Sequence, residues 1–294
     1  MTEKLQEFEI YRKKECKKAN TFFICSGVLI VLGCIGFLLF APLVILFFVG
    51  IILLICGFSV RSNISKEFKE KFIIDIVKDI YPDADYYPKQ GLDLSAILEP
   101  GFFKYPDRFH SEDYVGAVYN GVPFMMSDFT LLERHESRSS NGGTTVTYQA
   151  YAKGRFMVFD FKRDFNQVLK IAETKYLGLT TKGLEQIETE SVEFNKKFKT
   201  YTSDSLTAFY VLTPQMQLKL LELESKFKGS IFFGFMKGKM YVAICDNISI
   251  LDINASKKVT EETLAMLESQ LLVPAAIINE LKLDSDKFNE GDAI

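Results

Sequence analysis

Two histidines that stand beside carboxylates are the residues of this sequence best suited to proton transfer. His110 precedes Ser111-Glu112-Asp113, and His135 is flanked by Glu133, Arg134 and Glu136. A histidine held by a carboxylate can serve as a general base near neutral pH. Both histidines lie in polar stretches, which are typical of solvated surface, so we interpret them as surface side chains rather than as an active site.

Cysteine chemistry is restricted to one side chain in the water-soluble part of the chain. Cys245 follows Val242-Ala243-Ile244 on a predicted strand, whereas Cys16 precedes a hydrophobic segment at residues 21–60 that holds three more cysteines. A thiol in apolar surroundings stays protonated and inert, so we interpret Cys245 as a buried core residue. One thiol and two histidines also do not supply the ligand set of a usual zinc site.

No motif of a common enzyme class occurs in the sequence. The phosphate-binding and dinucleotide-binding glycine patterns, the His-Glu-x-x-His zinc motif and the Gly-x-Ser-x-Gly nucleophile motif are missing. Asn141-Gly142-Gly143 resembles part of a phosphate loop, but neither a lysine nor a helix follows directly, which favours a flexible hairpin tip. We therefore expect that the protein is not an enzyme and has no catalytic residues, no cofactor and no metal ligands.

The most informative element of the sequence is a long segment without charge. Residues 21–60 contain no Asp, Glu, Lys, Arg or His. A helix crosses the bilayer core with about 20 residues, so this segment is long enough for two spans. Pro42 marks the turn, because proline lacks an amide donor and disfavours helix at the preceding residue. We predict a transmembrane hairpin over residues 21–60, with helices at about 21–40 and 43–60.

Basic residues flank this hairpin on both sides. Residues 1–66 carry 8 Lys+Arg against 4 Asp+Glu, and residues 67–294 carry 27 against 34. Because Lys- and Arg-rich flanks stay in the cytoplasm, we predict that both termini and the soluble domain lie on the cytoplasmic side of the inner membrane. The alternative, a signal peptide followed by one span, is disfavoured because no cleavage site closes the first apolar stretch. The acidic soluble domain argues against nucleic acid as a partner.

The regions around the hairpin follow from periodicity. Residues 1–20 form a basic cytoplasmic segment. Residues 61–81 are predicted as a juxtamembrane helix, which ends at Pro82 and which we expect to dock on the soluble domain; lying on the membrane surface is the alternative. Apolar residues recur every four positions in this helix, at Ile64, Phe68, Phe72, Ile76 and Ile80.

The soluble domain, residues 82–283, is predicted to be α+β, with an antiparallel sheet and a few packed helices; residues 284–294 form a flexible acidic tail. Two hairpins turn at Asn120-Gly121 and Lys237-Gly238. Pro123 weakens the second strand of the first hairpin or places it at an edge. Further strands are expected at 129–133, 146–152, 155–161, 168–173, 199–202 and 248–253, with a polar loop at 135–144 and a turn near Lys153-Gly154.

Helices dominate the last third of the predicted domain. A short helix begins after Asp204, and Thr213-Pro214 supplies the N-cap and the first residue of the next helix. We expect Leu218 and Leu221 to face inward. Residues 259–281 are predicted to be helical.

Three stretches of the sequence carry a family resemblance. The first is the N-terminal hydrophobic hairpin, and the second is Glu112-Asp113-Tyr114-Val115-Gly116 with Ser127-Asp128. The third runs from Val192 to Asp204, with Phe194 and Phe198, and continues through Leu212-Thr213-Pro214. Together they resemble the "domain of unknown function 3137" family of prokaryotic membrane proteins, and the third stretch is the most specific. The resemblance implies a bacterial inner membrane protein and supplies neither an activity nor catalytic residues.

Three functions are compatible with these features. The first is an interaction module that binds a protein or lipid at the cytoplasmic face. It is favoured because the sequence has a membrane anchor and a sizeable folded domain but no group of reactive residues. A small-molecule or lipid sensor is the alternative, and it requires an apolar pocket. An enzyme of unrecognised type is the third, with Asp160, Arg163, Asp164 and Asp204 as scattered candidates. We expect the lipid bilayer and a protein as partners and no nucleic acid, and we leave a homo-oligomer open.

Overall fold

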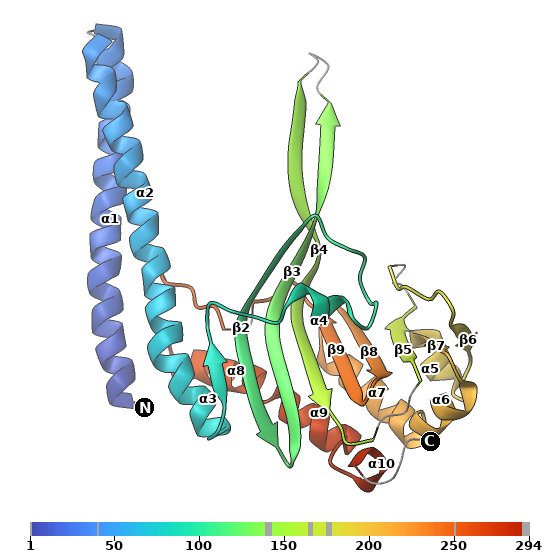
Figure 1. The fold of residues 1–294 in the computed structure, drawn as a ribbon. Coiled ribbons are helices and arrows are strands. Elements are labelled where there is room, and N and C mark those ends of the chain that lie inside the picture. The colour runs from blue at the N-terminus through green and yellow to red at the C-terminus, as the bar shows by residue number, and fades with distance from the viewer. Residues whose placement is uncertain are drawn as a thin grey trace. The chain divides into compact units, whose positions relative to one another are not determined.

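The computed structural model describes residues 2–39, 41–138, 143–163, 167–174, 178–249 and 251–289 (Figure 1). The chain divides into two compact units. The anchor unit comprises residues 1–76 and 251–268, and the sheet unit comprises residues 77–250 and 269–294. The predicted soluble domain is therefore interrupted, because residues 251–268 pack with the N-terminal helices.

Two long helices form the core of the anchor unit. They are α1 (Thr2–Leu39) and α2 (Val44–Phe68), joined through the 3-10 turn η1 (Ala41–Leu43); α2 continues through the π-helical turn η2 (Lys69–Ile73) into α3 (Ile74–Ile80). Leu5–Gly36 and Val44–Ile80 are long and apolar enough to cross a membrane. The predicted hairpin about Pro42 is confirmed. The basic N-terminal segment is itself helical from Thr2 and lengthens the first helix.

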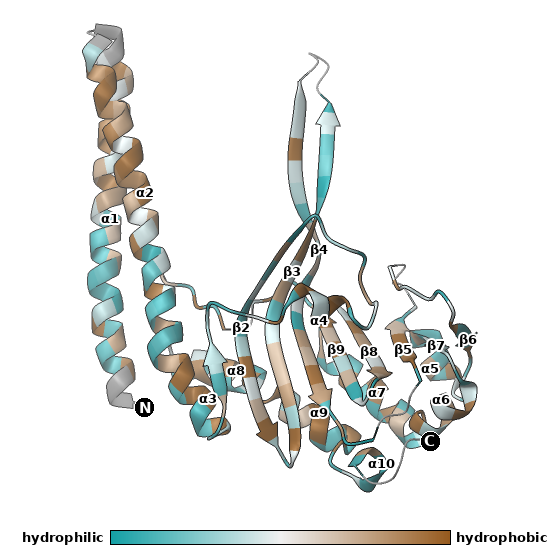
Figure 2. Cartoon of the chain, viewed as in Figure 1, coloured by the Kyte–Doolittle hydropathy of each residue, from teal (hydrophilic) through white to brown (hydrophobic). Residues whose placement is uncertain are grey.

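Small residues let the two helices of the hairpin approach closely. A Cβ atom at Gly33 would lie 2.4 Å from the backbone nitrogen of Phe47, and one at Gly50 would lie 2.7 Å from Cγ1 of Ile30. The Ser26 hydroxyl donates a hydrogen bond to the Gly50 carbonyl at 2.7 Å. Such close backbone approach is the usual way in which helices associate in lipid. Figure 2 shows that the two helices are most hydrophobic over the same part of their length.

The predicted juxtamembrane stripe is buried. Ile64, Phe68 and Phe72 are at most 8% exposed. The Phe8 ring of α1 packs on Phe68 and Phe72, with centroids 5.1 Å apart in both pairs. The stripe therefore packs in part against the N-terminal helix, whereas residues 1–20 were expected only as a basic segment.

The sheet unit is built on one antiparallel sheet of nine strands. Their spatial order is β1-β2-β3-β4-β9-β8-β5-β7-β6, and each adjacent pair is antiparallel. The strands are β1 (Asp85–Tyr87), β2 (Arg108–Tyr119), β3 (Val122–Arg138), β4 (Thr144–Asp160), β5 (Leu169–Glu173), β6 (Glu185–Ile187), β7 (Phe198–Thr202), β8 (Ser230–Met236) and β9 (Lys239–Cys245). With the helices below, this confirms the predicted α+β class.

Helices lie on both faces of this sheet. They are α4 (Leu94–Leu98), α5 (Val192–Lys197), α6 (Ser205–Val211), α7 (Pro214–Lys226), α9 (Val273–Leu281) and α10 (Asp286–Asn289), while α8 (Glu261–Leu271) begins in the anchor unit. Figure 1 shows α4 on one face and α7 and α9 on the other. Phe102 and Phe103, which follow α4, are buried against Phe129, Phe156 and Phe232 of the sheet.

Both predicted hairpin turns are confirmed. Asn120 and Gly121 have φ angles of 48° and 78°, and Lys237 and Gly238 have φ angles of 51° and 67°. Two successive residues with positive φ give the turn whose twist matches that of paired strands.

The predicted turn at Lys153-Gly154 is wrong. Residues 146–152 and 155–161 were expected as two strands, but β4 runs without interruption from Thr144 to Asp160. A Cβ atom on Gly154 would lie 1.9 Å from the carbonyl oxygen of Ile244 on β9. The glycine is required by a close approach of two backbones, which a sequence pattern does not distinguish from a turn.

Three predictions around β3 also need correction. The strand expected at 129–133 is part of the longer strand β3. The polar loop expected at 135–144 is shorter, because residues 135–138 belong to β3 and Thr144 begins β4. Residues 139–142, which include part of the Asn-Gly-Gly tip, lie outside the described residues. Pro123 lies in an interior strand, but β4 pairs with β3 only from Phe124 onward, so the missing amide removes no hydrogen bond from that pair.

Further differences lie near the C-terminus. Residues 248, 249 and 251–253 form no strand, and residue 250 lies outside the described part. On α7, Leu218 is 58% exposed, whereas Leu220 and Leu223 are buried, so the inward face is rotated from the predicted one. Part of the expected acidic tail is helical, because α10 covers residues Asp286–Asn289. Its Phe288 side chain is 1% exposed. The short helix after Asp204 and the helix capped by Thr213 are confirmed.

Candidate functional site

The helix α6 is fixed at its N-terminus by a side-chain cap. The Asp204 carboxylate accepts a hydrogen bond from the Thr207 amide at 2.8 Å. This backbone hydrogen bond holds the pKa of Asp204 below its ordinary value of 3.8. An Asp at this position satisfies a helix amide that would otherwise lack a partner, which makes it a favoured starting residue for so short a helix.

The outer face of α6 carries large apolar side chains in the open. Thr207, Ala208 and Val211 turn inward and are buried. The opposite face presents Leu206 at 81%, Phe209 at 45% and Tyr210 at 40% exposure. Their spacing of three and four residues places them on one side of the helix.

Two cations border this face. Arg163 Nη1 donates a hydrogen bond to the Tyr210 hydroxyl at 2.7 Å. Lys287 Nζ lies 5.2 Å from the centroid of the same ring and donates to the Val211 carbonyl at 3.1 Å. Burial lowers the pKa of Lys287. Leu206, Phe209, Tyr210, Arg163 and Lys287 are referred to below as the α6 surface.

The anchor unit holds a separate group of buried charges. Arg12 forms a two-pronged ion pair with Glu9 on α1, with both nitrogen–oxygen distances at 2.8 Å. Glu9 also accepts a hydrogen bond from the Val259 amide at 2.9 Å, and Arg12 donates to the Ala255 carbonyl at 3.2 Å. These contacts fasten the segment 251–259 to the N-terminal helix of its own unit.

A groove runs beside this fastening. It has a volume of about 690 Å³ and is lined by Leu5, Gln6, Glu9, Ile10 and Lys13 of α1 and by residues 258–262. A second groove, of about 420 Å³, lies between α1 and the η2 region. The second groove is lined by the rings of Phe8, Tyr11 and Phe72 and by four charged side chains, which are Glu7, Glu67, Lys71 and Asp75.

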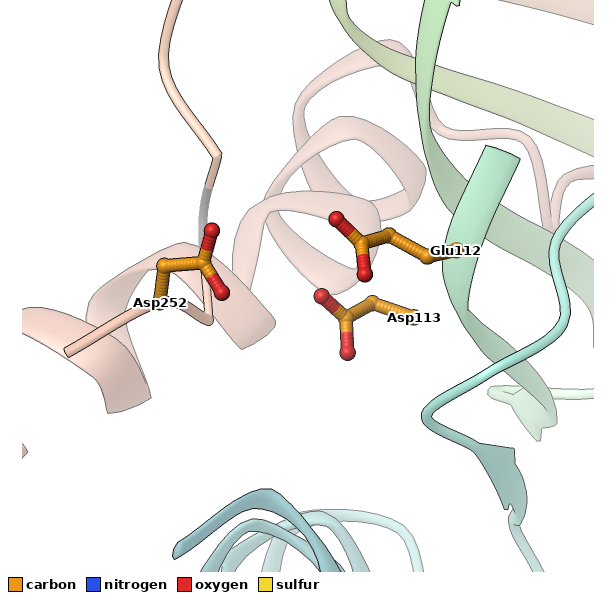
Figure 3. Close-up of side chains that lie close together, drawn as sticks. All are labelled: Glu112, Asp113 and Asp252. Carbon is orange, nitrogen blue, oxygen red and sulfur yellow. The ribbon is translucent and has the colours of Figure 1, made fainter. Parts of the chain in front are cut away.

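The sequence candidates near His110 do not form a catalytic group. Glu112 and Asp113 are neighbours on β2 (Figure 3). His110 Nε2 is 3.7 Å from Glu112, and its side chain is 66% exposed. Asp113 is fully buried and accepts a hydrogen bond from the Tyr86 hydroxyl at 2.8 Å. Asp252, the third labelled side chain, belongs to the anchor unit, where Lys69 pairs with it at 2.7 Å.

The other sequence candidates are also dispersed. His135 Nε2 lies 3.1 Å from Glu133, with the histidine side chain 45% exposed. Asp160 pairs with Lys239 at 3.0 Å. Asp204 caps α6 and Arg163 donates to Tyr210 of the same helix, while Asp164 lies outside the described residues. Cys245 was interpreted as a buried core residue but is only partly buried, packed against the core; desolvation raises its pKa to about 12.

A buried charge cluster in the sheet unit escaped sequence analysis. Arg155 on β4 is 2% exposed, and its Nη2 lies 3.1 Å from Asp246. Asp128 stands opposite Arg155 in the register of β3 and β4 and is 5% exposed. Burial lowers the pKa of Arg155, and the two carboxylates oppose that shift. The only sequence signal was an arginine at the start of a strongly apolar run.

The space between the sheet and the α4 region is filled by aromatic rings. The centroids of Phe103 and Phe129 are 5.3 Å apart, and those of Phe102 and Phe232 are 5.5 Å apart. These rings belong to the packed aromatic core of the sheet unit.

Part of the sheet unit and residues 251–268 of the anchor unit match a known family model. Residues 152–283 match the family model described as "Protein of unknown function (DUF3137)". The matched residues make up less than half of the chain. The match includes the Phe-x-x-x-Phe and Leu-Thr-Pro stretches and confirms the predicted resemblance; the hairpin and residues 112–128 lie outside it. No curated protein matches the chain.

One solved structure has a weakly similar fold and little sequence identity to this chain. It is the crystal structure of the mycobacterial trehalose monomycolate transport factor A, with 11% sequence identity and a TM-score of 0.39. The alignment covers 68% of this chain and 91% of that chain. A TM-score this low carries no conclusion about the present protein.

Proposed function

We propose that this protein is a membrane-anchored interaction module that binds a protein partner through the α6 surface. The observation that carries the proposal is the exposed face of α6, where Leu206 is 81% and Phe209 45% exposed. Large apolar side chains gathered on one exposed face mark interaction sites. Tyrosine and arginine, which border this face, are the residue types most enriched at the energetic centres of interfaces.

The chemistry of the α6 surface defines the kind of partner. Arg163 and Lys287 beside the apolar side chains favour a partner that supplies both apolar contacts and carboxylates. The hairpin keeps the protein at the membrane, so the partner is expected to be a membrane protein or one recruited there. Arg163 and Lys287 both contact Tyr210, and two cations beside a phenol and an apolar face suit recognition of a carboxylate.

We further propose that both termini and the sheet unit face the cytoplasm. The support is the Lys and Arg excess on both flanks of the hairpin. Fusions of the full chain to green fluorescent protein or alkaline phosphatase at the C-terminus test this orientation. Fluorescence without phosphatase activity is expected, and active phosphatase would overturn it.

The experiment for the binding function is purification of the intact protein from native membranes in mild detergent, followed by mass spectrometry of bound proteins and lipids. The variant Leu206→Glu is compared with Leu218→Glu, since Leu218 on α7 is also exposed, at 58%. We expect a stoichiometric protein with the wild type and with Leu218→Glu, and its loss with Leu206→Glu. Because both side chains are solvated, neither change should lower the unfolding temperature.

Two results would contradict the proposal. Retention of the partner by Leu206→Glu would show that α6 is not the contact surface. Recovery of the protein with one enriched lipid or small molecule, and with no partner protein, would instead favour the sensor hypothesis.

A further inference from the structure

The strands β3 and β4 extend beyond their neighbours in the sheet (Figure 1). The pairing of β2 with β3 ends at Arg108 and Leu132. On the other side, β9 pairs with β4 only along Arg155–Asp160. Beyond these points β3 and β4 pair only with each other among the described strands, up to Arg138 and Thr144. Residues 133–138 and 144–150 are called the β3–β4 arm.

The base of this arm is fastened to the rest of its unit. Asp107 accepts a hydrogen bond from the Arg134 amide at 2.8 Å, and the Arg108 guanidinium lies 3.5 Å from the centroid of the Tyr148 ring. The Tyr151 hydroxyl donates to the Lys104 carbonyl at 2.5 Å. The arm is therefore held in a defined direction, although an isolated two-stranded ribbon has little stability of its own.

The two edges of the arm differ in chemistry. Residues 133–138 on β3 read Glu-Arg-His-Glu-Ser-Arg, and such charged side chains protect a strand edge from unwanted pairing. Residues 144–150 on β4 read Thr-Thr-Val-Thr-Tyr-Gln-Ala, with no charge, no proline and four β-branched side chains. Exposed strands of this composition are usually avoided, because their free amides and carbonyls are a template for another strand.

We propose that the β4 edge of the arm pairs antiparallel with the same edge of a second copy of this chain. Residues 144–150 fit a two-fold axis through Thr147, because no like charges then oppose each other. Val146 would face Tyr148 of the second copy, and aromatic and β-branched residues are favourable cross-strand pairs.

The charges on the neighbouring strand are compensated within each copy, because Arg134 Nη2 lies 2.5 Å from Glu136 Oε1 on β3. On β3, Arg134 stands opposite Tyr148 and Glu136 opposite Val146. Across two copies, one row of side chains therefore reads Arg134, Tyr148, Val146 and Glu136, so the new contact joins Tyr148 to Val146 and brings no like charges together. A four-stranded sheet replaces two marginal ribbons, so the second copy supplies the stability that each arm lacks.

Disulfide trapping tests this pairing in the full chain. Residues opposite each other in an antiparallel pair have Cα atoms about 4.5–5.5 Å apart, which is within reach of a disulfide. The variant Thr147→Cys is oxidised in native membranes and compared with Ser137→Cys, which lies on the charged edge of the same arm. We expect a disulfide-linked dimer with Thr147→Cys. With Ser137→Cys we expect no more linked dimer than the wild type forms through its native cysteines, which both variants retain.

A charge at the same position provides the second test. Thr147→Lys would place two ammonium groups opposite each other at the axis and is expected to raise the dimer dissociation constant about tenfold or more. Size-exclusion chromatography with light scattering on the detergent-solubilised full chain measures it. Thr147 is exposed, so an unchanged unfolding temperature shows that the fold is intact.

Three outcomes would overturn the inference. Equal trapping by Thr147→Cys and Ser137→Cys would show collision rather than a defined pairing. An unchanged dimer with Thr147→Lys would place the interface elsewhere. Trapping of Thr147→Cys to a different protein would assign the edge to another partner.

Discussion

The buried arginine of the sheet unit gives the sharpest test of the fold. Arg155 is 2% exposed, and its partner Asp246 has a side-chain exposure of 4%. Asp128, on the adjacent strand, is 5% exposed. Replacing Arg155 by Met, which has a similar length and no charge, would leave two buried carboxylates without their cation. Breaking a buried pair in this way costs about 3–5 kcal/mol.

A comparison between variants separates charge from packing. Asp246→Asn leaves Arg155 beside Asp128, so it should cost less than Arg155→Met. The triple change of Arg155→Met with Asp128→Asn and Asp246→Asn removes all three charges and should recover most of the loss, because well-packed neutral groups often replace a buried ionic cluster without cost. For a unit of this size, about 3–5 kcal/mol corresponds to a fall of roughly 6–20 °C in unfolding temperature.

The measurement is proteolysis of the full-length protein in mild detergent at increasing urea, with the unfolding temperature followed by circular dichroism. The reasoning would be refuted if Arg155→Met lost less than about 1 kcal/mol, the range of an exposed ion pair. It would also fail if the triple variant were less stable than Arg155→Met, since packing rather than charge would then dominate.

Two further predictions concern β4 and β9. Gly154→Ala is expected to disrupt the pairing of β4 with β9, because the added Cβ would lie 1.9 Å from the Ile244 carbonyl oxygen. The control is Gly121→Ala, whose Cβ would meet no atom within 4 Å and which carries only the strain of its positive φ. The unfolding temperature should fall further with Gly154→Ala than with Gly121→Ala. Cys245, with its pKa raised to about 12, should stay a thiol between pH 7 and 9. Site-resolved mass spectrometry should therefore show slow alkylation by iodoacetamide at pH 8 that becomes fast in urea; equal rates in both would contradict its burial.

Local interactions allowed several elements to be predicted from the sequence. The uncharged residues 21–60 and Pro42 indicated the hairpin, because bilayer thickness and the missing proline amide act on neighbouring residues alone. Asn120-Gly121 indicated a turn, because these two residues adopt positive φ at low cost. Thr213-Pro214 indicated a helix start, and the Thr213 hydroxyl indeed accepts from the Met216 amide at 3.3 Å.

Contacts between distant residues decided what the sequence did not reveal. The Lys153-Gly154 pattern indicated a turn, but Gly154 is needed for the close approach of β9. That strand lies some 90 positions further along the chain, so local sequence does not report it. Residues 1–20 were interpreted only as a basic segment, yet Glu9 and Arg12 in it hold Val259 and Ala255. The exposure of Leu206 was also hidden, since leucine in a short helix is usually buried. Sequence patterns report a residue's own neighbourhood, whereas burial and close approach depend on which distant segments the fold brings together.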